Sequence, residues 1–321
     1  MRATYIQTLR DQLQPSLNPN GYKVLDLFAG CGGLSVGFEA AGFDVTGYEM
    51  NRDACATYNA SLHGKCIQEL LTTETVFPAA DVIIGGPPCQ PFSVIGHQAG
   101  QEDRRNGLEV FAHAVKSVQP KVWMFENVRG LLGRSKEYLD TVLAKMTNMG
   151  YAVEQPLIIN ARHYGVPQNR ERVVVVGHRL PAFLWPEKLE KQFTVRSAIG
   201  RTARRTPRDG RFLTQAMDCY IAKYEKASCC RQPRDLHLDM PARTLTCRNL
   251  GGATGDMIRL RLPDGRRRLL TVAEAARLQS FPPWFRFAGS HTSRMNQIGN
   301  AVPPMLALML GNAVKDALLG E

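Results

Sequence analysis

The residue with the clearest chemical potential is a cysteine between prolines. Cys89 lies in Pro87-Pro-Cys-Gln-Pro-Phe-Ser93, directly after an apolar run that predicts a strand over Asp81–Ile84. Prolines fix the backbone on both sides, and a rigid, exposed thiol can act as a nucleophile. A lone cysteine is more often a buried small apolar residue. The position at the end of a strand favours the nucleophile here.

Glu126 is the candidate partner of this cysteine. It ends the apolar run Lys121-Val-Trp-Met-Phe125, which predicts the next strand. The carboxyl ends of parallel strands meet at one edge of a sheet, so Glu126 and Cys89 can be brought together. A glutamate at a strand end is usually a cap or an ion-pair partner, so its assignment depends on that proximity.

A glycine-rich loop predicts a cofactor site at the same edge. Asp26-Leu-Phe-Ala-Gly-Cys-Gly-Gly33 allows backbone amides to approach a ligand closely. Glu49 ends the next predicted strand, where a carboxylate commonly binds ribose hydroxyls. The loop alone could serve NAD, FAD or S-adenosylmethionine, or be only a structural turn. It matches neither G-x-G-x-x-G nor a Walker motif, which favours a cofactor without a phosphate.

The elements around these loops predict an α/β fold with a doubly wound, mostly parallel, Rossmann-like sheet. Besides the strands above, the pattern predicts strands at Lys23–Phe28, Asp44–Tyr48 and Arg172–Gly177, and helices at Leu34–Ala41, Thr271–Gln279 and, amphipathic, Leu306–Leu319. We expect a catalytic and cofactor-binding domain at 1–180, a smaller basic domain at 181–285, and a hinge and C-terminal helix at 286–321 that return to the first domain.

Positive charge is concentrated in one segment. The chain has 321 residues, with 40 Lys and Arg against 29 Asp and Glu, for a net charge of +11. Between Arg196 and Arg268 the sequence contains 15 arginines, 2 lysines and 7 acidic residues, so the net charge of this segment is 17 − 7 = +10. A basic segment on a near-neutral chain is typical of a surface that binds a polyanion. The alternative is a solvated charged face, but the dominance of arginine favours contact with phosphates and bases.

The same composition excludes several classes of protein. At 44% apolar residues the chain is globular. We find neither a run long enough for a membrane span nor a secretory leader, and we expect no membrane partner. The 8 cysteines form no C-x-x-C pair. They are consistent with free thiols in a reducing cytoplasm, and we expect no metal.

The chain resembles the DNA cytosine-C5 methyltransferases of the prokaryotic restriction-modification type over roughly residues 20 to 310. The matching segments, in order, are Asp26–Gly33, Pro87–Ser93, Glu126–Val128, Gln168–Arg172, Thr271–Phe281 and Gln297–Pro304. The proline-bounded cysteine motif and Gly299-Asn-Ala-Val-Pro-Pro304, taken together, are highly specific for this family. Thr244-Leu245 resembles the pair that closes this family's target-recognition region, which makes 181–285 the small target-recognition domain.

The resemblance implies methylation of cytosine C5 in double-stranded DNA with S-adenosyl-L-methionine. Cys89 would attack C6 and so make C5 nucleophilic, while protonated Glu126 would hydrogen-bond N3. C5 would take the methyl group from the sulfonium, and loss of its proton and of Cys89 would restore the ring. Arg172, and less directly Arg170, would hold the O2 side of the base and the neighbouring carboxylate. Because C5 and C6 are buried in the base stack, the base must be flipped out.

The same resemblance implies two sets of binding residues. The cofactor would contact Phe28, Ala29, Gly30, Cys31, Gly33, Glu49, Met50, Cys66, Ile67, Pro88, Leu108, Asn300, Ala301 and Val302. DNA would contact Gln90, Ser93, Gln168, Arg243, Thr244 and Arg248. Further implications are a functionally paired restriction endonuclease, a monomeric chain and a cytoplasmic, nucleoid-associated location.

Two departures from the family pattern and two alternatives accompany this interpretation. Cys66 stands where the family usually has an aspartate that meets the adenine amine, and Met50 replaces an aromatic cover. One alternative is the tRNA-methylating branch, whose Cys-Phe-Thr signature is matched only by Thr246-Cys-Arg248. The other is a catalytically silent DNA-binding relative, which the intact Cys89, Glu126, Arg172 and Asn300 argue against.

Overall fold

The computed structural model describes residues 4–88, 107–133, 135–207, 210–227, 234–252 and 255–320. The first elements are α1 (Tyr5–Gln12), β1 (Lys23–Leu27), α2 (Gly33–Ala40), β2 (Asp44–Glu49), α3 (Arg52–Ser61), β3 (Cys66–Gln68) and β4 (Val82–Gly85). They are followed by α4 (Gly107–Val118), β5 (Val122–Val128), η2 (Arg129–Leu132), α5 (Lys136–Asn148), β6 (Ala152–Val153), β7 (Leu157–Asn160), η3 (Ala161–Tyr164), β8 (Gln168–Asn169) and β9 (Glu171–His178).

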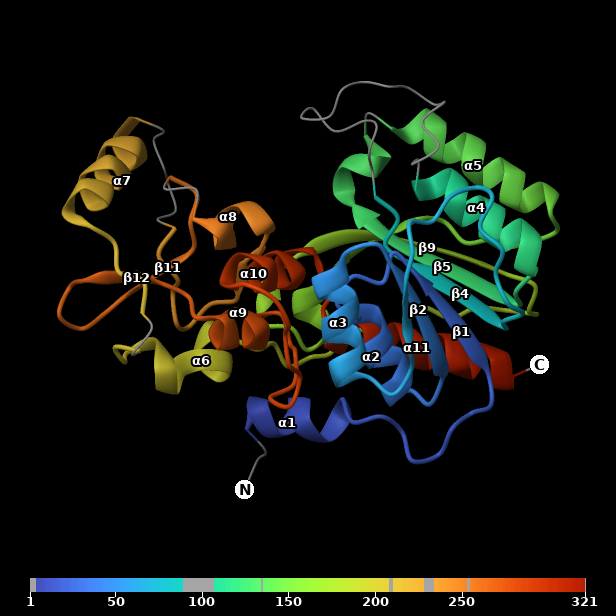
Figure 1. Ribbon diagram of the computed structural model, residues 1–321, viewed down its shortest axis with the longest axis horizontal. Helices are drawn as coiled ribbons and strands as arrows, with labels where there is room; N and C mark the ends of the chain where they lie inside the picture. The colour runs from blue at the N-terminus through green and yellow to red at the C-terminus, as the bar shows by residue number, and fades with distance from the viewer. Residues whose placement is uncertain are drawn as a thin grey trace.

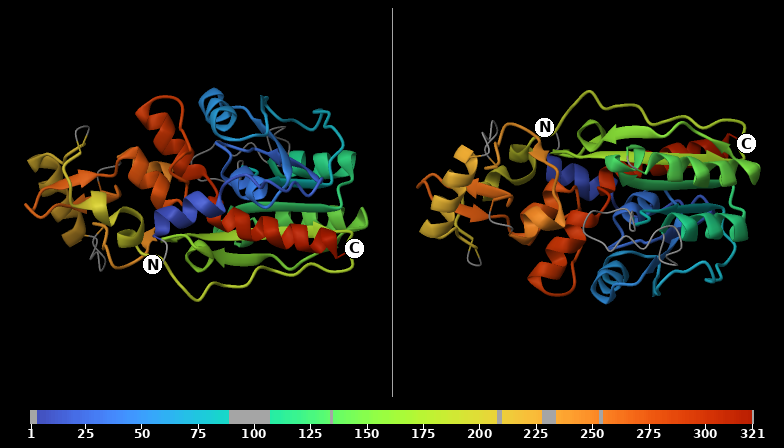
Figure 2. Two further views of the ribbon diagram at one scale, coloured as in Figure 1. Left: turned by 90° about the horizontal axis from the view of Figure 1, so that it is seen from below. Right: turned by 90° about the horizontal axis from the view of Figure 1, so that it is seen from above.

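The remaining elements are shorter until the chain returns to the sheet. They are α6 (Val195–Ala203), α7 (Gln215–Ala227), β10 (Ala242–Arg243), α8 (Cys247–Gly251), β11 (Arg259–Arg261), β12 (Arg267–Leu269), α9 (Val272–Leu278), α10 (His291–Asn300) and α11 (Pro304–Leu319). The molecule is elongated, with the sheet at one end and the group around α6, α7, β11 and β12 at the other (Figures 1 and 2).

The central sheet has the order β3-β2-β1-β4-β5-β9-β6, with β7 also paired to β9. Strands β3, β2, β1, β4 and β5 are parallel, whereas β9 runs antiparallel to β5, and β6 and β7 antiparallel to β9. This confirms the predicted doubly wound, mostly parallel fold and each of the predicted strands. The direction of the strand order reverses at β1 and β4, and that switch point is where sheets of this kind bind ligands.

Strand residues alternate between two hydrophobic cores because successive side chains point to opposite faces of a sheet. Val122 and Met124 of β5 face the core that contains α2, α3 and α11. Trp123 and Phe125 face the core that contains α4 and α5. Both faces of the strands are therefore apolar, as expected for parallel strands covered on two sides.

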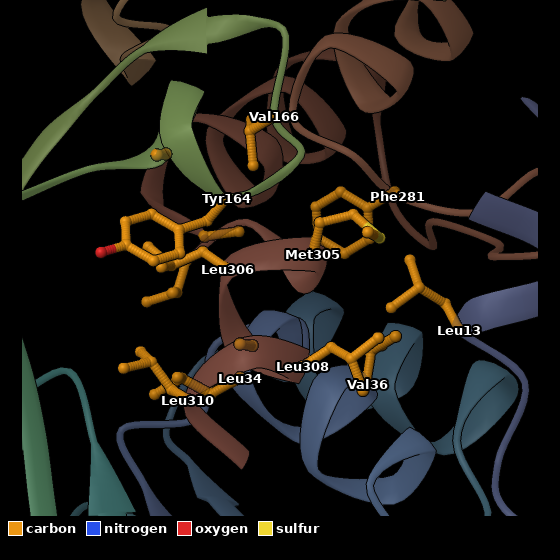
Figure 3. Close-up of a cluster of buried hydrophobic side chains, with 14 of the residues drawn as sticks. Leu13, Leu34, Val36, Tyr164, Val166, Phe281, Met305, Leu306, Leu308 and Leu310 are labelled. Atoms are coloured by element: carbon orange, nitrogen blue, oxygen red, sulfur yellow. The ribbon is translucent and has the colours of Figure 1, made fainter. Parts of the chain in front are cut away.

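The C-terminal helix packs directly against α2 (Figure 3). A Cβ at Gly37 of α2 would overlap the backbone of Ala307 and Leu308, so glycine permits this close approach. The predicted terminal helix is confirmed, with Asp316 and Leu319 exposed. Its broad buried face consists of Pro304, Met305, Leu306, Ala307, Leu308, Leu310, Gly311, Ala313, Val314 and Leu318. The stretch His291–Leu319 is long and apolar enough to cross a membrane, but 61% of its most apolar window is buried inside the fold.

The segment expected to form the smaller domain contacts the rest of the chain at several places. Ala242 and Arg243 of β10 pair in parallel with Gln168 and Asn169 of β8. Helix α10 packs against both α8 and α9. The β8–β10 pairing therefore links the two parts of the chain. The predicted domain limits stay a prediction.

Candidate functional site

A cavity of about 940 Å³ lies at the carboxyl ends of β1, β2, β4 and β5. Its volume falls within the roughly 300–1,000 Å³ that is usual for small-molecule sites. Most of the residues predicted to bind the cofactor line it: Phe28, Ala29, Gly30, Cys31, Gly33, Glu49, Met50, Pro88, Asn300, Ala301 and Val302. Glu126, Arg170 and Arg172 line the same cavity. The structure thus brings most of the predicted cofactor residues together with three of the predicted catalytic residues.

The glycine-rich loop turns sharply after β1. Phe28 (φ 59°), Gly30 (φ 56°) and Gly32 (φ 91°) all adopt left-handed backbone conformations, which are unfavourable for a phenylalanine. The Gly30 amide donates to Glu49 Oε2 at 2.9 Å, and the Asn51 amide donates to Glu49 Oε1 at 2.7 Å. These two hydrogen bonds fix the Glu49 carboxylate at the cavity wall. Its remaining lone pairs can accept hydrogen bonds from hydroxyl groups.

Asp26 is a cavity residue that the sequence analysis did not single out. It lies inside β1 and is fully buried. Ser35 Oγ donates to its Oδ2 at 2.6 Å, whereas its buried Oδ1 has no hydrogen-bond partner among the described residues. Burial, opposed by the Ser35 hydrogen bond and reinforced by the charge of Glu49, raises the pKa of Asp26 from 3.8 to about 7. An aspartate within the apolar run Val-Leu-Asp-Leu was the available signal, since a buried carboxylate needs a partner.

Three other positions expected to bind the cofactor do not line this cavity. Leu108 is buried in α4 in the core on the α4–α5 face. The Cys66 amide donates to Asn59 Oδ1 at 2.8 Å, and burial raises the pKa of the Cys66 thiol. Ile67 is exposed on β3. The wall next to β3 is instead formed by 69–71, because the chain turns toward the cavity only after the strand has ended.

The C-terminal segment completes the cavity. A Cβ at Gly33 would overlap the carbonyl oxygen of Val302, so glycine allows the junction of α10 and α11 to lie against the first loop. Asn300 Oδ1 accepts from the Cys247 thiol at 2.8 Å, which links this junction to α8. Helix α10 and its N-cap Ser290 also contribute polar residues that the sequence analysis did not assign to the site: Ser290, Thr292, Ser293, Asn296 and Gln297. Only the tertiary fold places them there.

Glu126 and Arg172 form an ion pair inside the cavity. Arg172 Nε lies 2.9 Å from Glu126 Oε1, and each side chain is only 12% exposed. The pair results from the antiparallel register of β5 and β9, which sets Val128 opposite Arg172 and Glu126 opposite Val174. Glu126 Oε1 nevertheless accepts no hydrogen bond of good geometry. A buried carboxylate oxygen without a hydrogen-bond partner is available to share a hydrogen bond with a ligand.

Two further residues of the Gln168–Arg172 segment have structural roles. The Arg170 guanidinium is buried and donates to the carbonyl oxygens of Leu245, Gly299 and Ala301. Arg170 therefore joins the segment before α8 to the end of α10, and it acts on the cavity as a positioning residue. Gln168, predicted to bind DNA, is fully buried and bonds to Leu245, Leu278 and Gln279. That prediction is wrong, because no face of the side chain is accessible.

The described residues just before the candidate nucleophile lie at the cavity. Pro88 lines it, and Asn127 Nδ2 donates to the carbonyl oxygen of Pro87 at 3.0 Å. Cys89, Gln90 and Ser93 lie outside the described residues. Their predicted roles therefore rest on the sequence and on the position of Pro88.

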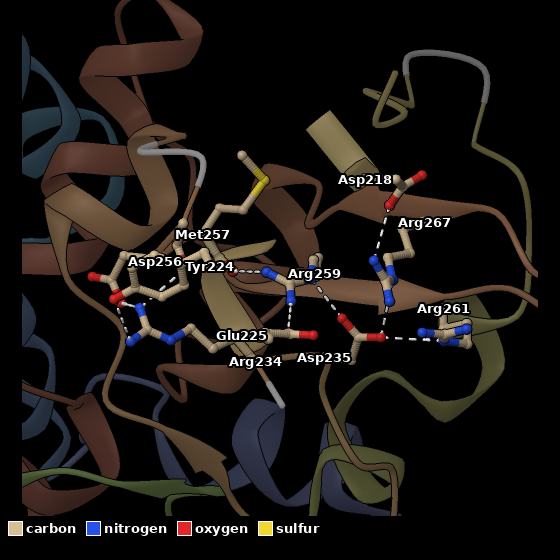
Figure 4. Close-up of polar contacts among 11 residues, drawn as sticks. Asp218, Tyr224, Glu225, Arg234, Asp235, Asp256, Met257, Arg259, Arg261 and Arg267 are labelled. Atoms are coloured by element: carbon tan, nitrogen blue, oxygen red, sulfur yellow. Dashed lines mark hydrogen bonds and ion pairs between the residues drawn. The ribbon is translucent and has the colours of Figure 1, made fainter. Parts of the chain in front are cut away.

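Many arginines of the basic segment are paired with acidic residues (Figure 4). Arg259 is fully buried and pairs with Glu225 and with Asp235. Asp235 also pairs with Arg261 and Arg267. Arg268 is fully buried against Glu274. The expectation that the whole segment is a DNA-binding surface is therefore corrected: several of its charges hold the small part of the fold together.

The arginines proposed to contact bases surround one carboxylate. Asp256 pairs with Arg234 and, at 2.7 Å, with Arg243 Nη2, while Arg248 Nε lies 3.9 Å away. The Arg248 side chain is 75% exposed, so it is the most available of the three. Thr244 Oγ1 donates to the Asn169 carbonyl oxygen at 2.7 Å, which anchors this segment to β8.

Comparison with known proteins decides the family. The profile of the C-5 cytosine-specific DNA methylases matches residues 22–211 and 186–316. The chain belongs to this family. It is a DNA cytosine methyltransferase, and methyltransferases of this family and fold use S-adenosylmethionine.

Relatives of known class are similar along most of their length. The chain is 51% identical to the Type II methyltransferase M.AplI of Arthrospira platensis, over 99% of this chain and 92% of that protein. It is 33% identical to M.NgoFVII of Neisseria gonorrhoeae, over 92% and 87%. Among solved structures, a putative DNA modification methyltransferase encoded within an E. coli prophage superposes with a TM-score of 0.69 at 23% identity, covering 93% of this chain and 100% of that one. This last likeness shows the fold.

The raised pKa of Asp26 predicts a pH-dependent stability of the methyltransferase. Above pH 3.8 the unfolded chain loses this proton while the folded chain keeps it up to about pH 7. The folded state then binds more protons, so the free energy of unfolding should fall as pH rises through this window, by up to about 1.4 kcal/mol per pH unit from this group. In Asp26→Asn, urea unfolding should show a flatter pH dependence between pH 4 and 7.

Ser35→Ala is the matched variant for this prediction. The Ser35 hydroxyl lowers the pKa of Asp26, so its removal should extend the fall in stability above pH 7. A slope that is identical in wild type and Asp26→Asn would show that Asp26 ionises equally in both states.

Proposed function

We propose that this chain methylates C5 of cytosine within a short specific sequence of double-stranded DNA, on a base flipped into the cavity. The observation that most supports this is the Glu126–Arg172 pair in one cavity with the glycine loop and Pro88. A duplex base cannot reach a cavity of this depth while stacked, so the nucleotide must leave the helix.

The chemistry needs a nucleophile on one face of the ring and a proton donor at its N3 edge. The Cys89 thiolate adds to C6, and the electron pair displaced from the C5–C6 bond makes C5 nucleophilic. Protonated Glu126 hydrogen-bonds N3 and so limits negative charge on the ring. Arg172, 2.9 Å from Glu126, orients that carboxyl group and can donate to O2. After methylation C5 loses its proton, the bond between Sγ and C6 breaks, and the thiolate leaves.

The residues around the glycine loop fit the cofactor. S-adenosylmethionine, when bound, supplies an electrophilic methyl group. Glu49, fixed by the amides of Gly30 and Asn51, can accept its ribose hydroxyls. The unpartnered Asp26 Oδ1 suits a ligand with a cationic group, because a nearby positive charge stabilises the ionised carboxylate. Asn300–Val302 would close the site from the C-terminal side.

We assign target recognition to the segment around Asp256. Arg243, Thr244 and Arg248 would contact DNA, together with Gln90 and Ser93, which follow Pro88 in the sequence. We further propose that 181–285 forms the target-recognition domain, that the chain acts as a monomer at the nucleoid, and that a restriction endonuclease recognises the same sequence. The last proposal rests on the Type II class of the relatives.

Substitution of the nucleophile tests the covalent step. Cys89→Ala should abolish methyl transfer while leaving binding of S-adenosylmethionine intact, because the substitution removes only the sulfur atom. The target sequence is first located by bisulfite sequencing of DNA from a methylation-free host that expresses the chain. With 5-fluorocytosine at that target, C5 holds no proton to lose, and wild type should form a denaturant-resistant DNA adduct. Absence of an adduct on a verified target would rule out attack by Cys89.

Glu126→Gln tests the proton donor separately. The amide keeps the shape but has no acidic proton, so kcat should drop by roughly 10² or more. DNA affinity should change far less, because a flipped base still fits. Single-turnover kinetics and gel shift measure the two parameters. If kcat stayed near the wild-type value, Glu126 would be only the ion-pair partner of Arg172.

Arg248→Gln tests base reading. A base contact should cost roughly 1–3 kcal/mol and relax the target at one position. Binding is measured on duplexes with each target base changed in turn. The matched control is Arg266→Gln, since Arg266 is also exposed but pairs with Asp264. A uniform loss on all sequences would instead make Arg248 a phosphate ligand, and no loss would remove it from the interface.

A further inference from the structure

A second cavity, of about 670 Å³, adjoins the first. Val128 and Arg172 line both cavities, so the two adjoin beside the Glu126–Arg172 pair. The remaining lining is polar: Arg129, Gly130, Asn160, Arg162, Asn169, Glu171 and Thr244. Three arginines and one carboxylate thus line this second cavity. None of the roles described above requires a cationic cavity at this place.

Arg162 is held in this wall by neutral groups. Its Nε donates to His163 Nε2 at 3.0 Å, and its Nη1 donates to Asn169 Oδ1 at 3.3 Å. Burial, and then the charges of Arg162 and Lys188, lower the pKa of His163, which keeps the imidazole neutral and able to accept. Asn160 caps η3 by accepting from the Arg162 amide at 3.2 Å. Both backbone and side chain of Arg162 are therefore positioned in advance.

The charge of Arg162 is not balanced by a carboxylate among the residues that the structure describes. This distinguishes it from its neighbours, since Arg172 pairs with Glu126 and Arg129 pairs with Glu171 at 3.0 Å. Arg162 is also half-buried, so its charge is only partly solvated. A guanidinium that is fixed, partly desolvated and uncompensated is suited to bind an anion with two oxygens in one plane.

Asn169 connects this arginine to the segment expected to recognise DNA. Its side-chain oxygen accepts from Arg162, and its carbonyl oxygen accepts from Thr244 Oγ1 at 2.7 Å. The cavity wall therefore joins η3, β8 and the residue next to Arg243. An anion bound here would lie between the catalytic pair and the recognition segment.

We propose that the second cavity binds a backbone phosphate of the DNA strand that bears the target cytosine, with Arg162 as its main ligand. The inference rests on the proposed function. A cytosine in the first cavity remains attached to its sugar and phosphates, and the second cavity adjoins the first at Val128 and Arg172. The phosphate next to the flipped nucleotide then meets Arg162, and Arg129 at the rim adds a second, more exposed cation.

Thermodynamic coupling between Arg162 and single phosphates tests this. The probe is the verified target duplex in which target-strand phosphates near the cytosine are replaced, one at a time, by uncharged methylphosphonates. One replacement should weaken binding by wild type about 10-fold but leave Arg162→Gln nearly unaffected. On the unmodified duplex, Arg162→Gln should bind about 10-fold more weakly, with a salt slope shallower by about 0.9.

Two variants serve as controls. Arg10→Gln removes an equal charge from an exposed position on α1 that lines neither cavity, and it should retain wild-type affinity, slope and phosphate sensitivity. Arg162→Lys keeps the charge without the planar fork, so it should retain the salt slope and lose part of the affinity. Circular dichroism and binding of S-adenosylmethionine show whether Arg162→Gln is folded. If it folds poorly, Arg162→Lys is used for the same binding measurements.

The outcomes separate this inference from the proposed function. If wild type methylates the duplex but no phosphate replacement is coupled to either Arg162 variant, the phosphate site is wrong and the proposed function stands. If the variants lose recognition of one base instead, Arg162 reads a base and the inference is likewise overturned. If wild type transfers no methyl group to any DNA, the proposed function itself fails.

Discussion

The close contact between α2 and the C-terminal segment is the constraint on which the rest of the structure depends. Gly33 and Gly37 let the backbone at Val302, Ala307 and Leu308 lie against α2, where any Cβ would overlap. This contact places Asn300–Val302 opposite the loop after β1. Without it the cavity would lack one wall, and Arg170 would lose two of the three carbonyls to which it donates.

Electrostatic balance divides the arginines into two groups. Those that meet carboxylates in the fold, such as Arg259 and Arg268, give their charge to internal ion pairs. Those with neutral or distant partners, such as Arg162 and Arg248, keep charge for a polyanion. Net charge alone therefore overstates the DNA-binding surface, because a buried ion pair contributes nothing to the field outside.

The active site combines groups that are unfavourable in isolation. Phe28 has a left-handed backbone, Asp26 is buried with an unpartnered oxygen, and Glu126 Oε1 accepts no well-aligned hydrogen bond. Each is maintained by the packed sheet beneath it, and each faces one cavity. Such costs concentrate at functional sites, where a ligand supplies the missing partner.

The sequence by itself determined β1, β2, β4, β5 and β9, the order of the loops and the family, because apolar periodicity and short motifs are local properties. It also identified Glu49, Glu126 and Arg172, which stand at strand ends or in such motifs. Tertiary structure alone decided that Gln168 is buried, that Leu108, Cys66 and Ile67 miss the cavity, and that Asp26 and α10 line it. It also decided which arginines meet carboxylates. The physical reason is that burial and charge pairing depend on neighbours distant in the chain, such as Gln168 with Gln279 or Arg268 with Glu274, and no local pattern records them.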